Sequence, residues 1–164
     1  MQIILPALGA LIAAQGGHFA GIVRGNGADA PPYALLVSPA SSELQDIAWG
    51  QYGKEVPGCG DRRDGKANTA AMLKAECAAA IAVHNLDIEG HKDWYLPALG
   101  EMNIAAANVP ELFAGDGIYW TSTQDSRYCA FGQDFADGYS HWHDEANECR
   151  VRAFRQIPLD LLTA

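Results

Sequence analysis

The sequence predicts an α+β fold in which two helices pack on one side of a twisted antiparallel sheet. Apolar residues recur at helical spacing in the middle of the chain, and short strand-like runs occupy both flanks. The chain contains 17 Gly and 8 Pro in 164 residues, which favours many short elements joined by turns over a helical bundle. Strands, then helices, then more strands are typical of this fold class.

A length of 164 residues fits one domain, and we expect residues 1–164 to form it around a single core. The formal net charge of -9 argues against a nucleic-acid partner, because an acidic chain is repelled by phosphate groups. Arg150, Arg152 and Arg155 cluster near the C-terminus. We expect these arginines to pair with the chain's many carboxylates.

Residues 1–52 are predicted to form strands. Gly17 to Arg24 alternates in side-chain character and is followed by the turn signal Gly25-Asn26-Gly27, and Tyr33 to Val37 is a short apolar run between prolines. Together they predict a hairpin with its connection at residues 25–32. A third short strand is expected around Ile47 to Gly50.

The apolar stretch Ile3 to Ala14 resembles the hydrophobic part of a signal peptide. It lacks a basic region before it and is interrupted by Pro6 and Gly9. It is also shorter than a membrane-spanning helix. We therefore expect no export signal and no membrane insertion.

Residues 53–67 are rich in glycine and charge and predict an exposed loop. Two helices are expected within residues 68–113. The first runs to His84 from an N-cap at Asn68 or Thr69, with its apolar residues at three- and four-residue steps. The second runs from about Leu99 to Ala107 and ends before Pro110, because the residue before a proline is pushed out of the helical region.

Residues 117–158 are predicted to form an antiparallel meander. Its strands are rich in aromatic and β-branched residues, and Asp137-Gly138 is a hairpin signal between two of them. The expected strands are Ile118–Thr123, Tyr128–Phe135, Tyr139–His143 and Cys149–Ile157.

Three segments in this half carry a family resemblance. Asp93-Trp94-Tyr95-Leu96-Pro97 with Glu101-Met102 resembles the W-x-L-P-x-x-x-E-L motif of the collagen-like-adhesin C-terminal domain family. Tyr119-Trp120-Thr121-Ser122-Thr123 resembles its W-T-S-T strand, and Val151-Arg152-Ala153-Phe154-Arg155 resembles its closing V-R-A-V-R. Gln15 to Ile22 is similar to the upstream part of small phage-encoded members. Met102 and Phe154 depart from the usual Leu and Val.

The resemblance implies a C-type-lectin-like fold in a phage or prophage tail-associated protein. It also implies a place in the virion, other tail proteins as partners and a homo-oligomer such as a trimer. The motif residues themselves have a structural interpretation. Trp94 and Leu96 share one strand face, and Arg152 lies among apolar residues, so we expect it to be partly buried and paired with a carboxylate.

Recognition of a ligand is therefore expected in the polar turns between these motifs, from Gln124 to Glu148. Aromatic, amide and charged side chains over a sheet are typical of a recognition surface, and the alternative is a solvated surface without a ligand. A host-surface glycan or protein is the expected ligand. The rings of Tyr139 and Trp142 are expected to stack on it. The predicted ligand contacts are Gln124, Asp125, Arg127, Tyr139, His141, Trp142, His143 and Asp144.

The same segment also contains candidate metal ligands. His141 and His143 share one strand face, with Asp144 or Glu145 close by, yet a polar outer face explains them as well. Calcium-dependent lectins carry Glu-Pro-Asn or Gln-Pro-Asp with Trp-Asn-Asp, and neither motif occurs. Acidic residues could offer oxygens to calcium, but we expect no cofactor.

Two other functional classes remain open. A structural tail or baseplate component would bind only other virion proteins, and the apolar segment Ile3 to Ala13 would be its contact. An enzyme of the formylglycine-generating type would need an accessible, essential cysteine. Cys59, Cys77, Cys129 and Cys149 show no nucleophile signature, and their even number fits either two disulfides or four thiols. We therefore expect a binding module and not an enzyme.

Overall fold

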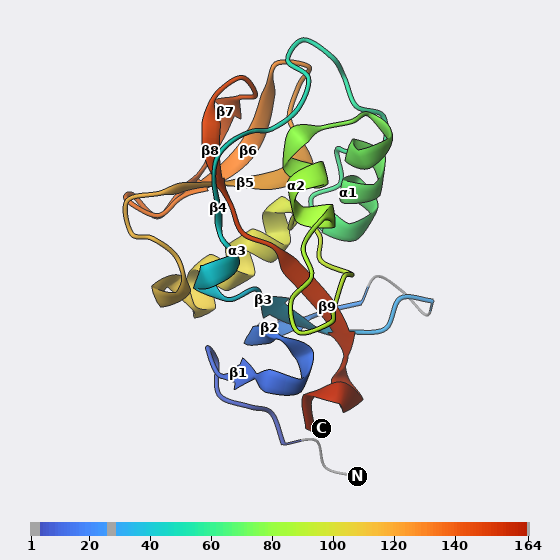
Figure 1. Ribbon diagram of the computed structural model, residues 1–164, viewed down its shortest axis with the longest axis vertical. Coiled ribbons are helices and arrows are strands. Elements are labelled where there is room, and N and C mark those ends of the chain that lie inside the picture. Colours follow the sequence, from blue (N-terminus) through green and yellow to red (C-terminus); the bar gives the residue numbers. More distant parts are fainter. Residues whose placement is uncertain (1–3, 26–28, 164) are drawn as a thin grey trace.

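The computed structural model describes residues 4–25 and 29–163, and its strands and helices form an α+β architecture. The strands belong to two separate sheets, which Figure 1 shows at opposite ends of the molecule. The single predicted sheet is therefore wrong. The first residue of the predicted assembly contact, Ile3, and residues 26–28 of the predicted hairpin connection lie outside the described residues.

The four-stranded sheet joins the two ends of the described chain. In spatial order it contains β1 (Leu11–Ile12), β2 (Gly17–Val23), β3 (Tyr33–Val37) and β9 (Phe154–Pro158). β2 and β3 pair antiparallel, which confirms the predicted hairpin. β9 pairs antiparallel with β3 from Tyr33 opposite Pro158 to Val37 opposite Phe154, so the end of the chain returns to its beginning.

The five-stranded sheet contains the rest of the predicted meander. In spatial order it contains β4 (Leu44–Ala48), β8 (Glu148–Val151), β5 (Ile118–Gln124), β6 (Cys129–Asp134) and β7 (Ser140–Asp144). β5, β6 and β7 form the antiparallel part. β8 runs parallel to β5, and the predicted strand Cys149–Ile157 divides at Arg152 between the two sheets. The fully antiparallel meander is therefore wrong.

Three α-helices occur in the described residues where two were predicted: α1 (Gly65–Lys74), α2 (Ala78–His84) and α3 (Leu99–Asn108). α3 confirms the second predicted helix. The first breaks in two because Glu76 adopts a left-handed conformation with φ 57°, and Cys77 is extended as the N-cap of α2. The amide of Cys77 donates to the carbonyl of Met72 at 3.0 Å, which closes the end of α1.

The start of α1 also differs from the prediction. Asp64 is the N-cap, and its side chain accepts a 2.9 Å hydrogen bond from the amide of Ala67. The segment 53–67 is therefore not an exposed loop throughout, since Val56 and Cys59 are buried within it. The predicted third strand lies a few residues earlier than expected, at β4.

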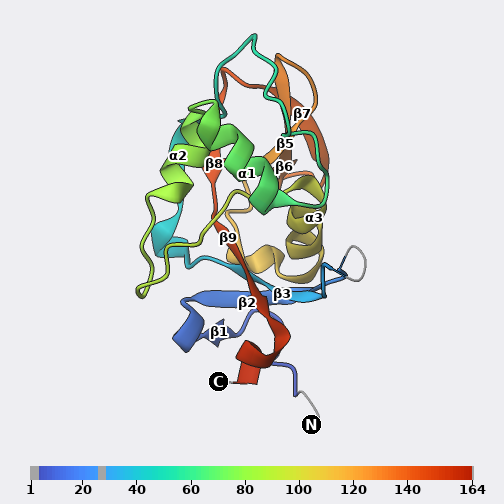
Figure 2. The same ribbon diagram turned by 90° about the vertical axis from the view of Figure 1, so that its right-hand side faces the viewer.

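Helices cover both faces of the five-stranded sheet, which corrects the predicted packing on one side. Consecutive residues of a strand point to opposite faces. Tyr119 joins the apolar core that contains α3, and Trp120 joins the core that contains α1 and α2. Figure 2 shows α3 on one side and α1 and α2 on the other. Short 3-10 helices complete the fold: η1 (Ala13–Gln15), η2 (Ala40–Ser42), η3 (Pro110–Leu112) and η4 (Leu159–Thr163).

The family-like motifs are all part of the scaffold. Trp94, Leu96, Glu101 and Trp120 are buried. Arg152 is also buried and lies 3.1 Å from the carboxylate of Glu43, which confirms the predicted buried ion pair. Any ligand contact must therefore come from other residues.

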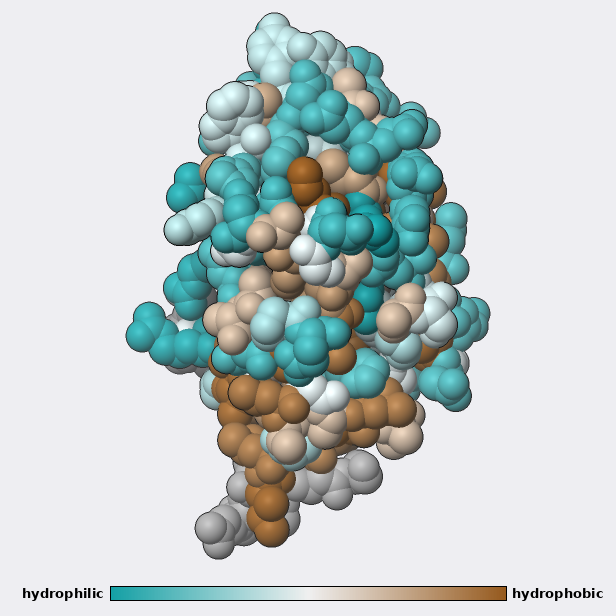
Figure 3. All heavy atoms as spheres, turned by 90° about the vertical axis from the view of Figure 1, so that its left-hand side faces the viewer, coloured by the Kyte–Doolittle hydropathy of each residue, from teal (hydrophilic) through white to brown (hydrophobic). Residues whose placement is uncertain are grey.

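The exposed apolar side chains are mainly aliphatic at one end of the molecule and aromatic at the other. The aliphatic ones lie mainly on the N-terminal segment and β2, and Figure 3 shows hydrophobic residues gathered at this end. The aromatic ones are Tyr52, Tyr128, Tyr139 and Trp142, and they lie at the far end of the five-stranded sheet or along its edge. Among the described residues, no helix combines the length and apolar character needed to cross a bilayer.

Candidate functional site

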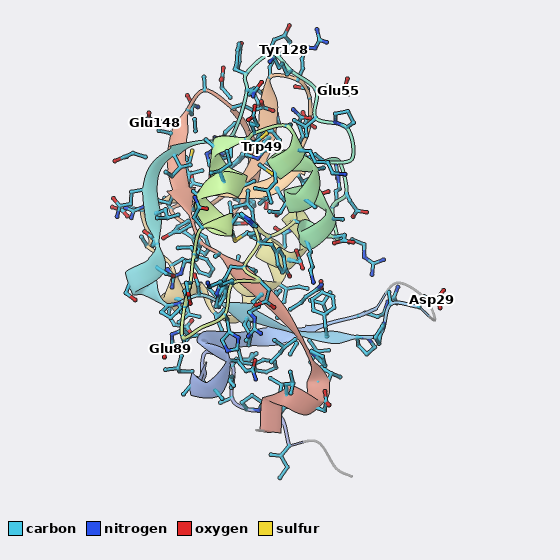
Figure 4. All side chains as sticks on the ribbon, turned by 45° about the vertical axis from the view of Figure 1, so that its right-hand side comes forward. Asp29, Trp49, Glu55, Glu89, Tyr128 and Glu148 are labelled. Atoms are coloured by element: carbon cyan, nitrogen blue, oxygen red, sulfur yellow. The ribbon has the colours of Figure 1, made fainter. Side chains whose placement is uncertain are left out.

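A hollow of about 750 Å³ opens beside the turn between β5 and β6. This is the end opposite the N-terminus, where Figure 4 labels Glu55 and Tyr128. The lining residues come from the segment before α1, the end of β5, the β5–β6 turn and one residue of β6: Glu55, Val56, Pro57, Gly58, Gly60, Arg62, Gln124, Asp125, Ser126 and Phe131. Two of the eight predicted contacts, Gln124 and Asp125, therefore line it.

Gln124 holds one wall of the hollow in place. Its Nε2 donates to the carbonyl of Lys54 at 3.0 Å and to Glu145 Oε1 at 2.8 Å, and its Oε1 accepts from the amide of Val56 at 2.8 Å. The amide of Gln124 donates to the carbonyl of Cys59 at 2.9 Å. Because both Nε2 and Oε1 are hydrogen-bonded within the protein, Gln124 positions residues 54–59, which we call the wall.

Arg62 is a candidate contact that the sequence did not single out, and it lines the hollow. Its guanidinium lies 5.2 Å from the centre of the Phe131 ring, in a cation–π arrangement. Arg62 is exposed and makes no ion pair with any described residue. Phe131 pairs across strands with Trp142, so both point to the face that carries Arg62. Arg62 thus lines the hollow, and the exposed indole of Trp142 lies on the same face of the sheet.

The two predicted loops meet. Cys129 pairs with Asp144, and the amide of Glu145 donates to the carbonyl of Tyr128 at 2.9 Å. Tyr128 also packs against Tyr52, with ring centres 5.3 Å apart. The carboxylate of Asp144 accepts from the amide of Ala146, so it shapes the β7–β8 turn.

Arg127 projects from the other turn. It is exposed, like Asp125 two residues before it. The carbonyl of Arg127 accepts a 2.8 Å hydrogen bond from the amide of Gly53, so the backbone of the turn is held while both charged side chains face solvent. These two remain available as polar contacts.

The remaining predicted contacts lie on β7, the edge strand of the sheet, except Tyr139, which directly precedes this strand. Trp142 is 64% exposed and Tyr139 is 67% exposed. Tyr139, His141 and His143 form a row of rings about 6 Å apart that continues to the buried Trp120. Trp142 points to the opposite face from this row. Tyr139 and Trp142 therefore offer exposed rings to opposite faces of this edge.

The two histidines have different electrostatic surroundings. His141 Nε2 lies 2.8 Å from Asp137, whose pKa is lowered by the amide of Tyr139 and then by His141. Burial, together with the nearby His141, lowers the pKa of His143, which keeps it neutral at physiological pH. In the described part of the chain, no three His, Cys, Asp or Glu side chains are arranged to hold a metal ion.

Glu145 is the residue whose role the sequence did not reveal. Its side chain is fully buried, and Oε2 has no hydrogen-bond partner. Burial raises the pKa of Glu145 to about 7, and the charge of Asp144 adds to the rise, while the hydrogen bond from Gln124 opposes it. Within a run of polar residues, Asp144 to Glu148, no sequence signal distinguishes this buried carboxyl from its exposed neighbours.

A second hollow of about 680 Å³ lies between the β2–β3 hairpin, the start of α1 and the C-terminal end of the chain. Its walls include Tyr33, Pro158 and charged residues of both signs. The eight residues predicted as ligand contacts, all of them described, are absent from its lining. The candidate site is therefore the first hollow together with β7.

Comparison with known proteins gives a likeness of fold to a solved structure. The chain matches no protein-family model and no curated protein. Its fold is similar to that of a fimbrial protein from Bacteroides ovatus known from a crystal structure, with a TM-score of 0.52 and 12% sequence identity. The match covers 74% of this chain and 35% of the fimbrial protein, so the chain spans about a third of that protein's length. At this identity the likeness concerns the fold alone.

Proposed function

We propose that this protein is a binding module with a C-type-lectin-like fold that recognises a host-surface glycan or protein. The observation that carries the proposal is the exposed indole of Trp142 beside the Arg62–Phe131 pair and the hollow. A flat aromatic ring stacks on the apolar face of a sugar or on a protein side chain at low entropic cost. Arg62, Asp125 and Arg127 supply polar contacts around it.

The sequence motifs support a location for this binding activity at a bacterial surface or a phage tail. The segments around Trp94, Trp120 and Arg152 resemble the collagen-like-adhesin C-terminal domain family, which occurs in bacterial surface proteins and in phage or prophage tails. Their burial is consistent with motifs that mark a scaffold and leave the ligand to the turns. A virion location at the phage tail follows from this resemblance and is part of the proposal.

A glycan array and binding to whole bacterial cells test the proposal. Trp142→Ala and Arg62→Ala should each lower binding at least tenfold, because central aromatic and arginine contacts contribute more than about 1.4 kcal/mol each. Ile81→Ala, which removes an exposed apolar side chain from α2, is the matched control and should bind as the natural protein does. Unchanged binding by both site variants would contradict the proposal.

The aliphatic end of the molecule favours a second candidate, a structural tail or baseplate component. Ile4 is 79% exposed, and Leu5, Leu8 and Leu11 are exposed beside it. The first charged side chain among Asp, Glu, Lys and Arg is that of Arg24, so the N-terminal segment also lacks charge. Large exposed apolar patches mark contacts between proteins. Sedimentation of the protein and of a Leu8→Asp, Leu11→Asp variant distinguishes the candidates, because an assembly part should form trimers or other oligomers that the variant loses.

A further inference from the structure

Glu145 lies where three segments of the chain meet. Its amide donates to the carbonyl of Tyr128 in the β5–β6 turn, and its carbonyl accepts a 3.2 Å hydrogen bond from the amide of Trp49. Its Oε1 accepts the 2.8 Å hydrogen bond from Gln124. The residue thus connects the β7–β8 turn with the other two segments from a fully buried position.

The surroundings of the carboxyl favour its protonated form. Its Oε2 has no hydrogen-bond partner. The charge of Asp144 in β7 acts on the carboxyl, and the carboxyl in turn acts on the thiols of Cys59, Cys77 and Cys129. None of these is a cation. The nearby Lys54 directs its ammonium to Gln51 Oε1 at 2.6 Å. A buried carboxylate with one neutral donor is costly, so its pKa rises to about 7.

Gln124 links this carboxyl to the wall of the hollow. The same Nε2 that donates to Glu145 also donates to the carbonyl of Lys54, and the Oε1 of the same amide holds the amide of Val56. Once ionised, Glu145 needs further donors, and water is the available source. Water reaches a fully buried group only when a covering segment moves, and the wall is joined to Glu145 through the single side chain of Gln124.

We propose that Glu145 is a proton-dependent latch on residues 54–59, which closes the wall of the hollow when protonated and releases it when ionised. The latch would regulate the same surface that we propose binds the ligand, and in that respect it rests on the proposed function. In the open state water reaches the carboxyl, which then ionises near its ordinary pKa of 4.5, whereas in the closed state it holds its proton to about 7. Opening therefore becomes more favourable as pH rises between these two values and levels off above them.

Hydrogen exchange of the wall tests the latch without any ligand. The amides of Val56 and Cys59, which donate to Gln124 Oε1 and to the carbonyl of Val56, report opening directly. After correction for intrinsic rates, their protection should fall on the order of tenfold or more between pH 5 and pH 8. Glu145→Gln, which cannot ionise, should show no such fall. Glu148→Gln, which changes an exposed carboxylate three residues away, should behave as the natural protein does.

A carbon-detected NMR titration of the Glu145 carboxyl in the natural protein gives an independent result that does not depend on the variant folding. Titration near pH 7 supports the latch, and titration near 4.5 overturns it. An equal fall of protection in Glu145→Gln also overturns it. Because these measurements use no ligand, they remain decisive whether or not Trp142→Ala abolishes binding to glycans or cells.

Discussion

The hydroxyl of Tyr33 in the N-terminal hairpin donates a 2.7 Å hydrogen bond to Glu101 Oε1 in the first turn of α3. Tyr95 donates to the same oxygen at 2.6 Å, and the amides of Gly65 and Ala98 donate to Oε2. Burial raises the pKa of Glu101, and these four donors oppose the rise. One carboxyl thereby joins the four-stranded sheet to the starts of α1 and α3.

Tyr33→Phe should lower the free energy of unfolding by about 1–2 kcal/mol, because it removes one of these four hydrogen bonds without changing the ring. Glu101→Ala should cost more than about 3 kcal/mol, since it leaves buried donors without an acceptor. Urea denaturation gives both values. Tyr52→Phe, at an exposed tyrosine, is the control and should stay within about 0.5 kcal/mol of the natural protein. A Tyr33→Phe protein as stable as this control would show that the junction does not stabilise the fold.

Glu43→Gln should be strongly destabilising because Glu43 neutralises two arginines and accepts from Tyr119. Arg152 is buried, and leaving a buried charge unpaired costs about 3–5 kcal/mol. Asp116→Asn removes an exposed carboxylate 3.6 Å from Arg150 and should cost less than about 1 kcal/mol. Thermal unfolding of the two variants at one pH checks the contrast. Equal losses in both variants would contradict the burial argument.

The elements whose positions depend on nearby residues could be predicted from the sequence. Alternation and prolines located β2 and β3, and Pro110 located the end of α3. The break between α1 and α2 carries no such signal, since Lys74, Ala75 and Glu76 are all residues that favour helices. Tertiary packing of Cys77 against Trp49 and its neighbours in the core overrides this preference.

The division of the last strand between two sheets also depends on distant contacts. Arg152 Nε donates to the carbonyl of Ser38 at 2.7 Å, where the chain leaves one sheet for the other, and no periodicity in residues 149–157 indicates that partner. In the candidate site, too, contacts between neighbouring strands could be predicted and contacts between distant segments could not. The two loops could be brought together from the sequence because β6 and β7 form a hairpin. Arg62 could not be placed there, because it lies 69 positions before Phe131 in the chain and reaches it only through the fold.

Stability should fall with rising pH because of Glu145. The unfolded carboxyl ionises near 4.5 and the folded one near 7, so its full contribution is present below 4.5 and is lost as pH rises to about 7. A rise of this size corresponds to about 3 kcal/mol. The raised pKa of Glu101 acts in the same direction, so the difference between the natural protein and Glu145→Gln isolates the effect of Glu145. Urea denaturation at pH 5 and pH 8 measures it, and a constant difference between the two proteins would contradict it.

Cys129 should be the one cysteine that reacts readily with a thiol reagent in the native protein. All four cysteines are free thiols in the structure, and Cys59, Cys77 and Cys149 are buried while Cys129 is half-buried. Burial, with smaller contributions from nearby carboxylates, raises the pKa of Cys129, so labelling should be slow and should accelerate with pH. Native protein at pH 8 should give about one labelled thiol and unfolded protein four.

Cys129→Ser should remove the native label and leave the three thiols exposed on unfolding. Fast labelling near neutral pH would instead indicate a thiolate held for catalysis, because only the thiolate is nucleophilic and the raised pKa disfavours it. That result, or rapid labelling of Cys149, would favour an enzyme of the formylglycine-generating type over a binding module. Fewer than four thiols after unfolding without a reductant would show that two of them pair as a disulfide in the protein as isolated.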